Sequence, residues 1–394
     1  MESLEDEQST KTDDTEKPKI SVPGEVIEEI LLRLPVKSIL RFRTLSKPWL
    51  SHISNPSFTK LHFTRATAAH RTALFISAYD ESTRKRHFLS AAHDGGPVTH
   101  LMTLEEPYST VTTQAEHLNG LVFFTCVKLD SDDVLVVNRS TRKIFKLPHP
   151  YTNDGEGDLC YLFGFDESRN EHKILMIKKL LKEPTRVQIM TFSLSTYSWR
   201  VIDAGPPVGF SWDSFYYESS VCVNSVVHIM LLSSYDILAF DLRTDKFSII
   251  STPQGVRSHE SSWRGGILLK RNRGKTMRCI FGYYKTMKIV FGSKKSFTFL
   301  DSWIDLDGSS PFPFPLDVNI DEVIFCPQNR KRLSFPQVLD QTCMVYGDEM
   351  SVPIYNRRSR CWKSSQFTLG HRFLCSKDVK FDEIKCYVES MLPL

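Results

Sequence analysis

The pattern of apolar and polar positions divides the chain into two parts. Between residues 22 and 63 the apolar side chains follow a helical period, and Val26, Ile27, Ile30, Leu31 and Leu34 form one wide stripe along a short helix. From about residue 72, short runs of β-branched and aromatic residues alternate with turn clusters, and helical periodicity is nearly absent until the end. The pattern therefore predicts an α+β chain, with a small all-α module followed by a large all-β domain.

Three to four helices are expected in the all-α module, which spans residues 20–68. The first starts near Pro23 and ends at Pro35, and the second covers about Val36 to Thr44. A third carries Trp49, and Pro48 is tolerated only in the first turn of that helix. A fourth opens at Asn55-Pro56, because Asn is a good N-cap and Pro suits the first helical position. Its inward-facing residues are expected to be Phe58, Leu61 and His62.

The all-α module is too short to bury a large core by itself, since small domains bury a smaller fraction of their surface. Part of its apolar surface therefore needs a partner. That partner is either the rest of this chain or another protein.

The all-β domain, residues 72–394, contains an internal repeat. An apolar strand, a polar turn with Ser or Thr, and a strand that opens on a large apolar residue recur from Val137, Phe192, Phe240 and Tyr355. A weaker copy starts at Tyr79, and a degenerate copy is expected near residue 298. A period of about 50 residues is typical of kelch-like β-propeller blades with four strands each. Six such units fit in the domain, and the alternatives are a β-sandwich or an irregular barrel.

Composition narrows the class of protein. The net charge of +4 is small for 394 residues, so general affinity for nucleic acid is not implied. The nine cysteines are scattered singly, which argues for reduced thiols in the cytoplasm or nucleus and against disulfides or a zinc site. Residues 1–19 hold seven acidic and three basic side chains, and we expect a disordered acidic tail there. Neither a secretory signal nor a membrane-spanning run is recognisable, so the chain is not expected to be secreted.

Signals for catalysis are poor. The phosphate-binding, nucleophile-elbow and zinc-protease motifs are all missing from the sequence. His117, His172 and His228 stand in strand-like contexts, where we expect them to pack in the core or to form hydrogen bonds. We therefore expect a protein that is not an enzyme and that holds no cofactor or metal ion.

Residues 257–295 form a strongly basic region, with eleven Lys or Arg and one acidic residue, Glu260. Such a region suits acidic or phosphorylated protein segments, because Arg clusters pair with phosphate. The alternative is a solvated, Lys-rich strand edge and hairpin tip. Nucleic-acid binding is less favoured, since no aromatic-basic face of a known type is present. The candidate substrate-binding residues are Trp263, Arg264, Lys270, Arg271 and Arg273.

The stretch VPGEVIEEILLRLPVKSILRFRTLSKPWLSHISNPSF, from Val22 to Phe58, closely resembles an F-box of the plant type. The matching features are Val22-Pro23, the Ile30–Pro35 segment, the Lys37–Arg43 segment, Ser46–Trp49 and the Ile53–Phe58 tail. Pro48 between Lys47 and Trp49 is a departure that would shift the third helix slightly.

The rest of the chain resembles the F-box-associated domain of plant F-box proteins. The cues occur in order over residues 117–250, and they weaken after residue 250. One departure is Asn224-Ser225, where the family usually has Asn-Gly. Serine tolerates a positive φ less well than glycine, so we expect that turn to differ. The other cues are His117–Leu121, Val137–Thr141 with Leu147-Pro148, Gly164–Asp166 with His172–Leu175, Val221–Val226 and Ile237–Asp241.

The resemblance implies a substrate-recognition subunit of an SCF-type E3 ubiquitin ligase. The F-box would dock on a Skp-family adaptor, and through it on cullin and RING subunits, while the β-domain would hold an unknown target protein. A scaffold that binds the adaptor without a role in degradation is the alternative. Some residues of the docking set, notably Ile30 and Trp49, are alternatively only core of the module, and Glu25, Glu28 and Lys37 would be rim charges. The expected adaptor-binding residues are Pro23, Ile27, Ile30, Leu31, Leu34, Pro35, Ile39, Leu40, Leu45 and Trp49.

Overall fold

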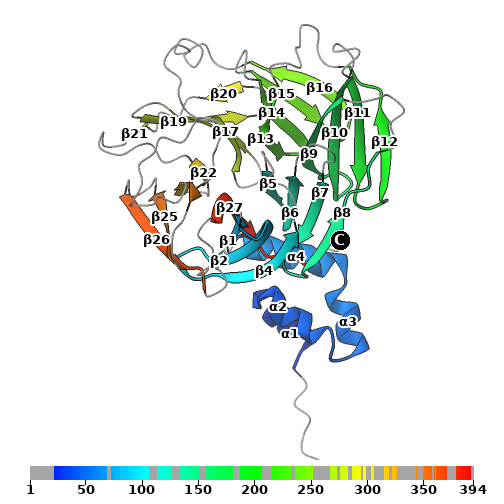
Figure 1. Ribbon diagram of the computed structural model, residues 1–394. Coiled ribbons are helices and arrows are strands. Elements are labelled where there is room, and N and C mark those ends of the chain that lie inside the picture. Colours follow the sequence, from blue (N-terminus) through cyan, green and yellow to red (C-terminus); the bar gives the residue numbers. More distant parts are fainter. Residues whose placement is uncertain are drawn as a thin grey trace, which may run out of the picture.

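A computed structural model shows a helical module below a ring of β-sheets (Figure 1). It describes residues 22–251 with gaps at 69–71, 81, 106–112, 127–132, 151–156, 181–186, 206–214 and 232–235. Between 267 and 344 it describes only the backbone of the strands. Residues 349–391 are described with gaps at 357–358, 360 and 371–378. The acidic residues 1–19 lie outside the described part of the chain.

The helical module contains four helices, as expected: α1 (Gly24–Arg33), α2 (Val36–Phe42), α3 (Lys47–Ile53) and α4 (Pro56–Ala68). Pro48 lies in the first turn of α3, where the Ser46 hydroxyl accepts a hydrogen bond from the Trp49 backbone N–H at 3.5 Å. Asn55 precedes α4, and its Oδ1 accepts from the Ser57 N–H at 2.8 Å. Ordinary capping chemistry therefore sets these helix starts.

The core of the module is built from the inner faces of all four helices. Phe58 and His62 of α4 are buried as expected, but Leu61 is 41% exposed, so the prediction that it faces inward is wrong. Leu61 lies three residues after Phe58 and one before His62, and only two of the three can point at the narrow core. The buried residues of this core include Leu31, Leu32, Val36, Ile39, Ile53 and Phe58.

The described strands of the β-domain form six sheets, as the repeat predicts. Three are four-stranded meanders of consecutive antiparallel strands. The first holds β5 (Thr113–Leu118), β6 (Leu121–Cys126), β7 (Asp133–Asn138) and β8 (Lys143–Lys146). The second holds β9 (Gly157–Asp166), β10 (Glu171–Leu180), β11 (Val187–Ser193) and β12 (Ser198–Ile202). The third holds β13 (Phe215–Val223), β14 (Val226–Leu231), β15 (Ile237–Asp241) and β16 (Lys246–Ile250).

The next two sheets keep the same plan with additions. One holds β17 (Ile267–Asn272), β18 (Thr276–Gly282) and β19 (Thr286–Ser293), and β19 then pairs with both β20 (Ser296–Thr298) and β21 (Trp303–Asp305). The degenerate repeat expected near residue 298 therefore corresponds to an outer strand in two pieces. The other sheet holds β22 (Pro315–Val318), β23 (Glu322–Phe325), β25 (Glu349–Asn356), β26 (Cys361–Thr368) and the short β3 (Gly96–Pro97).

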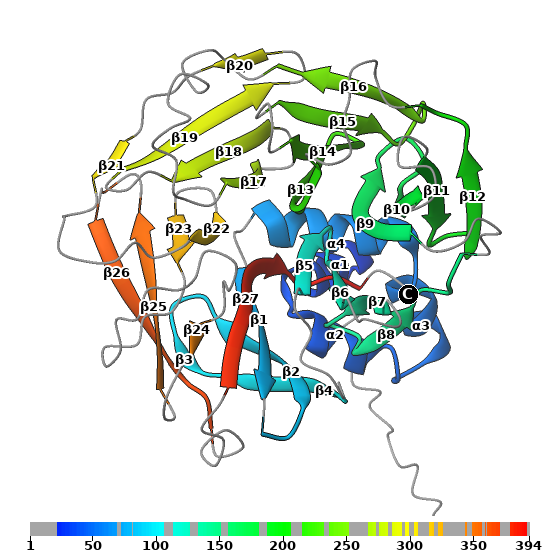
Figure 2. The ribbon, with the colours of Figure 1, turned by 45° about the horizontal axis from the view of Figure 1, so that its top comes forward.

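The sixth sheet joins distant parts of the sequence and closes the ring. Its order is β24 (Cys343–Met344), β27 (Val379–Val388), β1 (Thr72–Asp80), β2 (Lys85–Ala92) and β4 (Thr99–Glu105). Around the ring, β27, β5, β9, β13, β17 and β22 contact one another in turn, and β22 meets β27 again. Figure 2 shows these strands nearest the middle of the ring. The architecture is a six-bladed β-propeller-like ring.

The hairpins of the repeat share one turn geometry. Arg142, Tyr197 and Asp245 each end a four-residue turn with a positive φ, at 57°, 52° and 57°. A left-handed residue at that position lets a short turn deliver the chain into the next strand. The copies at Val137, Phe192 and Phe240 are the hairpins between the third and fourth strands of their blades, and the copy at Tyr355 occupies the same place between β25 and β26.

The weak copy at Tyr79 is not equivalent to the others. It joins β1 to β2, which are the second and third of the four long strands of their blade, because β27 precedes β1 in the sheet and the two-residue β24 only adds to its edge. The repeat therefore marks a hairpin type rather than a fixed place in the blade. Sequence spacing alone does not reveal this, since β27 lies roughly three hundred residues from its partner.

The Asn224-Ser225 turn does not differ from the family's Asn-Gly turn in the way that the sequence suggests. Asn224 and Ser225 have φ of 53° and 62°, so both central residues are left-handed, as in Asn119-Gly120. The Ser225 hydroxyl accepts a hydrogen bond from the Glu167 backbone N–H at 2.8 Å. At Gly120, in contrast, an added Cβ would lie 1.9 Å from the Cβ of Ser390. Glycine is therefore required at position 120, whereas position 225 has room for a side chain that links two blades.

A buried ion pair within the β9–β12 blade also forms a hydrogen bond to the chain that follows β15 in the β13–β16 blade. The Lys173 ammonium lies 2.7 Å from Asp166 Oδ2 and donates to the Leu242 carbonyl at 3.1 Å. Burial raises the pKa of Asp166, but hydrogen bonds from Lys173 and Ser168 outweigh it and hold that pKa below its usual value. The Gly164–Asp166 and His172–Leu175 cues in the sequence thus belong to a packing contact between blades.

Candidate protein-interaction site

The outer face of α1 carries an exposed apolar stripe. Val26 and Ile30 are four residues apart on α1, so they lie one above the other on one side of the helix, and Val22 lies just before the helix begins. The side chains of Val22, Val26 and Ile30 are 46%, 47% and 52% exposed. The opposite side of α1 buries Leu31 and Leu32 in the core of the module. We call Val22, Val26 and Ile30 the α1 stripe.

Two further leucines of the module are exposed. Leu45, in the turn between α2 and α3, is 64% exposed, and Leu50 of α3 is 44% exposed. Together with Leu61 and the α1 stripe, they make up six of the ten large apolar residues that are exposed in the described chain. Exposed apolar side chains concentrated on one small module are candidates for contact with another protein.

The ten residues expected to bind the adaptor separate into three groups. Leu31 and Ile39 are buried, and they support the surface rather than form it. Ile30 is exposed and is not core, whereas Trp49 packs against the core, with its ring 5.7 Å from that of Phe42. Of the other residues, Ile27, Leu34 and Leu40 are partly buried, and Pro23, Pro35 and Leu45 are exposed.

The structure adds Val26 and Leu50 to the exposed apolar residues of the module. Val26 belongs to the apolar period that predicts the first helix, so the signal was present in the sequence. A wide stripe does not show by itself which of its edges faces the core and which faces solvent. Leu50 has no comparable signal, because α3 is only seven residues long.

The α1–α2 turn is held from α4. His62, buried in α4, forms a hydrogen bond between its Nε2 and the Leu34 carbonyl at 2.9 Å. Glu29 of α1 pairs with Arg65 of α4 and with Arg33, and these hydrogen bonds hold the pKa of Glu29 below its usual value. The turn that contains Pro35 therefore has a defined position relative to α1.

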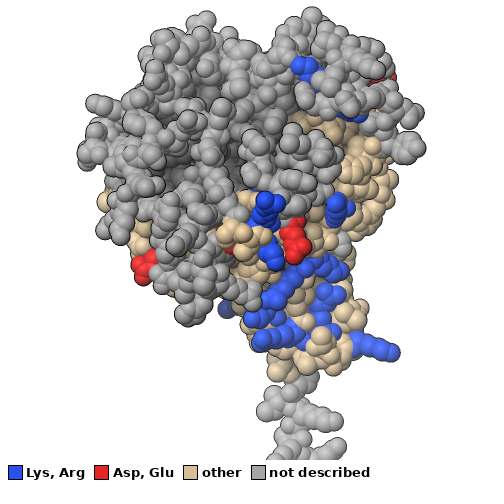
Figure 3. All heavy atoms as spheres, in the orientation of Figure 1, with Lys and Arg blue, Asp and Glu red and all other residues tan. Residues whose placement is uncertain are grey.

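Basic side chains outnumber acidic ones on the module. Residues 22–68 contain seven Lys or Arg and three acidic residues, Glu25, Glu28 and Glu29, all of them on α1. Figure 3 shows Lys and Arg side chains gathered over the helical module. Lys37, Arg41, Lys47 and Lys60 are exposed, and the predicted rim charges include Lys37 among them. A partner with acidic side chains near its edge would fit this module.

The structure describes the side chain of none of the five candidate substrate-binding residues. Trp263, Arg264 and Arg273 lie outside the described residues. Lys270 and Arg271 lie on β17, of which only the backbone is described. Their role remains a prediction from the sequence.

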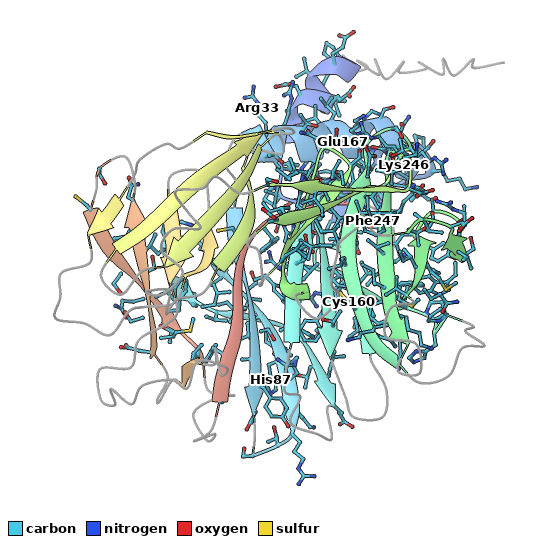
Figure 4. All side chains as sticks on the ribbon, turned by 90° about the horizontal axis from the view of Figure 1, so that it is seen from above. Arg33, His87, Cys160, Glu167, Lys246 and Phe247 are labelled. Carbon is cyan, nitrogen blue, oxygen red and sulfur yellow. The ribbon has the colours of Figure 1, made fainter. Side chains whose placement is uncertain are left out.

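The two faces of the ring differ in their connections. In the three meanders, the strands are joined on one face by tight turns of two or four residues, at 119–120, 139–142, 167–170, 194–197, 224–225 and 242–245. Gly120 and Ser140 both contact Ser390 beside the module, and Figure 4 shows Glu167, Lys246 and Phe247 toward the same side as Arg33. Because the strands alternate in direction, the longer connections start and end on the other face, the side of His87 in Figure 4. These connections include 127–132, 147–156, 203–214 and 251–266.

The histidines noted in the sequence have structural roles, as expected. His172 is buried and its Nε2 lies 3.1 Å from the Leu118 carbonyl oxygen. His117 Nε2 accepts a hydrogen bond from the Gly120 N–H at 3.2 Å. His228 is buried, and burial lowers its pKa to about 4. Within the described ranges, no three His, Cys, Asp or Glu side chains are grouped so that they would hold a metal ion. No helix in the same ranges is long and apolar enough to span a membrane.

Comparison with known families agrees with this architecture. The F-box domain family matches residues 21–61, and the F-box associated beta propeller domain family matches residues 65–276. The second match alone covers more than half of the chain. The protein therefore belongs to the F-box proteins that carry an F-box associated β-propeller domain.

Relatives from a plant have the same description. The Arabidopsis thaliana F-box protein At5g65850 is 28% identical over 253 residues, which cover 62% of this chain and 59% of the relative. The Arabidopsis thaliana chain At3g10240, also described as an F-box protein, is 29% identical over 245 residues, or 59% of this chain and 60% of the relative. The chain thus matches about three fifths of the length of these relatives.

Among solved structures, TolB from Acinetobacter baumannii has a TM-score of 0.45 and 9% identity, covering 84% of this chain and 71% of that chain. A similarity of this size says nothing about function.

Proposed function

We propose that this protein is the substrate-recognition subunit of an SCF-type E3 ubiquitin ligase. The F-box docks on a Skp-family adaptor, which connects it to cullin and RING subunits. The β-propeller domain holds the target protein. Free thiols at Cys160, Cys222, Cys361 and Cys386 suit a protein of the cytoplasm or nucleus.

The observation that carries this proposal is the α1 stripe. Val22, Val26 and Ile30 are exposed on the module that matches the F-box domain family, while the other side of α1 packs in the core of that module. Apolar anchors of this kind supply most of the affinity in protein interfaces, and rim charges contribute less. The exposed basic side chains of α2, α3 and α4 favour an adaptor surface with acidic groups at its rim.

The two faces of the propeller suit different roles, one beside the F-box and the other for binding the target protein. In the three meanders, tight turns join the strands on the face beside the F-box, and the longer connections, including 251–266, leave the strands on the opposite face. Binding residues are found more often on long loops held by a rigid scaffold than on tight turns. We therefore place the target protein on the face away from the F-box. A target held there needs no acid, base or cysteine from this chain, because transfer depends on its proximity to the rest of the complex.

A complex pull-down tests the proposal. Full-length wild-type protein is expected to recover the adaptor, cullin and RING subunits together. The double variant Val26→Arg/Ile30→Arg should lose all three, because two charges replace apolar side chains in the docking surface. These positions are better than Leu34 or Pro35 for this test, since Leu34 packs against the core and its carbonyl binds His62.

Val201→Arg is the matched control, because Val201 is 62% exposed on β12, outside the module. It should recover the complex like the wild type. Recovery of the adaptor without cullin would favour the alternative, a scaffold with no role in degradation. Recovery of the whole complex by the double variant would overturn the docking surface.

A further inference from the structure

The segment that follows β27 enters the core of the F-box. Met391 is 7% exposed and packs in the same cluster as Leu31, Leu32 and Val36. These residues come from α1 and α2, so a side chain some 360 positions away in the sequence completes the module's core. The F-box is therefore not closed by its own four helices alone. We call residues 389–391 the β27 tail.

The tail also satisfies the start of α2. The residue that precedes this helix is Pro35, which has no side-chain group that can cap it. The Glu389 carboxylate accepts a hydrogen bond from the Val36 backbone N–H, with Oε2 and N 3.1 Å apart. The first N–H groups of a helix lack partners within the helix, and a carboxylate is well suited to them. Glu389 thus acts as a cap supplied by the β-domain.

The tail is fixed on its other side to the propeller. The Ser390 N–H donates to the Ser140 hydroxyl at 3.1 Å, and the Ser390 side chain is buried against Gly120. Just before the tail, the Tyr387 ring lies 4.1 Å from the Arg139 guanidinium carbon. Burial lowers the pKa of Arg139 to about 10, and the Glu389 carboxylate opposes that shift. The tail therefore cannot move without disturbing two turns of the first meander.

The contacts of the tail converge on the part of the F-box that is expected to dock. Val36 follows Pro35 directly, and Leu31 lies one residue after the exposed Ile30 of the α1 stripe. The α1–α2 turn is thus held from one side by His62 and from the other by Glu389. The β-domain supplies the cap of α2 and one side chain of the module's core, so this helix pair will present its outer face in one geometry only while that domain holds the tail.

We propose that Glu389 and Met391 are positioning residues for adaptor binding, and that they couple the docking geometry of the F-box to the folded propeller. This inference rests on the proposed adaptor-binding function. The contacts of the β27 tail would also fix the orientation of the target-binding face relative to the docked F-box.

The test compares tail variants in the full chain by two measurements. Hydrogen exchange of the peptide spanning residues 31–39 reports the turn without any partner, and calorimetric titration with a purified Skp-family adaptor reports docking. In Glu389→Ala, we expect exchange in this peptide to be about tenfold faster and adaptor binding to be about fivefold weaker, as for loss of a helix cap. Glu389→Gln keeps an acceptor oxygen and should restore most of both.

Glu349→Ala is the matched control, because Glu349 is exposed on β25, in a different sheet from β27 and outside the F-box. It should change neither measurement. If Glu389→Ala does not fold, Met391→Val takes its place in both measurements, because this substitution shortens the side chain but keeps it apolar.

The outcomes separate the two proposals. If the wild type does not bind the adaptor, the proposed function fails, while the exchange measurement still decides whether the tail holds the turn. If the adaptor binds but the tail variants leave exchange unchanged, the coupling is wrong. Faster exchange with unchanged adaptor affinity also overturns it, because the tail would then only stabilise the module.

Discussion

The F-box and the propeller blades differ in what they do with apolar side chains. In β10, Ile174, Leu175 and Met176 are consecutive and all fully buried, because each blade lies between two others and both of its faces are covered. In α1, Ile30 and Leu31 are also consecutive, but one is 52% exposed and the other is buried. The F-box has a neighbour on one side only.

The difference shows where apolar residues report stability and where they report binding. The inner strands of a blade bury their apolar side chains, so changes there should alter the free energy of unfolding. The outer face of the F-box carries exposed apolar side chains, so changes there should alter affinity for a partner. The predictions below challenge this contrast, from the largest expected effect to the smallest.

Phe163→Ala should lower the free energy of unfolding of the β-domain by about 4 kcal/mol. Phe163 is fully buried in β9, and its ring stacks on Phe123 of the neighbouring blade with centroids 5.2 Å apart. Urea unfolding followed by tryptophan fluorescence measures the change. The exposed Ile144→Ala is the control and should have little effect. Equal effects from the two variants would remove the contrast between interior and surface.

Lys173→Met should destabilise the β-domain by about 3 kcal/mol, because it leaves the buried Asp166 carboxylate without its cation. The same replacement at the exposed Lys143 should be nearly neutral. Thermal unfolding of the two variants beside the wild type gives the answer. A neutral Lys173→Met would mean that the blades are held together without this ion pair.

Acid should weaken the β-domain through His228. Its folded pKa is about 4, against an ordinary value of 6.5, so between these values the unfolded chain binds a proton that the folded chain does not. Stability therefore falls as the pH drops through this window, by about 2 kcal/mol at pH 5. His228→Gln should lose this part of the difference between pH 7 and pH 5, whereas His149→Gln, at an exposed site, should keep it. A wild-type slope in His228→Gln would contradict the burial argument.

Leu61→Lys should change the stability of the F-box by less than about 0.5 kcal/mol, because this side chain faces solvent. Phe58→Lys, on the same helix but buried, should instead prevent the module from folding. Circular dichroism at the helical minimum distinguishes the two variants. Loss of helix in Leu61→Lys would return Leu61 to the core, where the sequence had suggested it belonged.

Local signals in the sequence were enough for much of this architecture. Pro48, Asn55 and the spacing of the Ser/Thr turns predict helix starts and hairpins correctly, because capping and turn chemistry act over a few residues. The six units follow from the same repeat.

Contacts between residues that are far apart in the sequence could not be predicted from it. The pairing of β27 with β1, the cap from Glu389 to Val36 and the insertion of Met391 depend on positions that meet only after the ring closes. The apolar period of α1 likewise identifies a helix, but it cannot show that Ile30 faces solvent and Leu31 the core. At Ser225, the local preference against a positive φ is overridden by a hydrogen bond to the next blade.

Titration of a purified Skp-family adaptor into the full-length protein tests the central claim most directly. Ile30→Arg should weaken binding by at least about 30-fold, or about 2 kcal/mol, while its unfolding transition stays at the wild-type position. Val201→Arg, which replaces an apolar residue of β12 that is even more exposed than Ile30, should bind within about twofold of the wild type. Wild-type affinity in a folded Ile30→Arg would contradict the assignment of the α1 stripe as the docking surface.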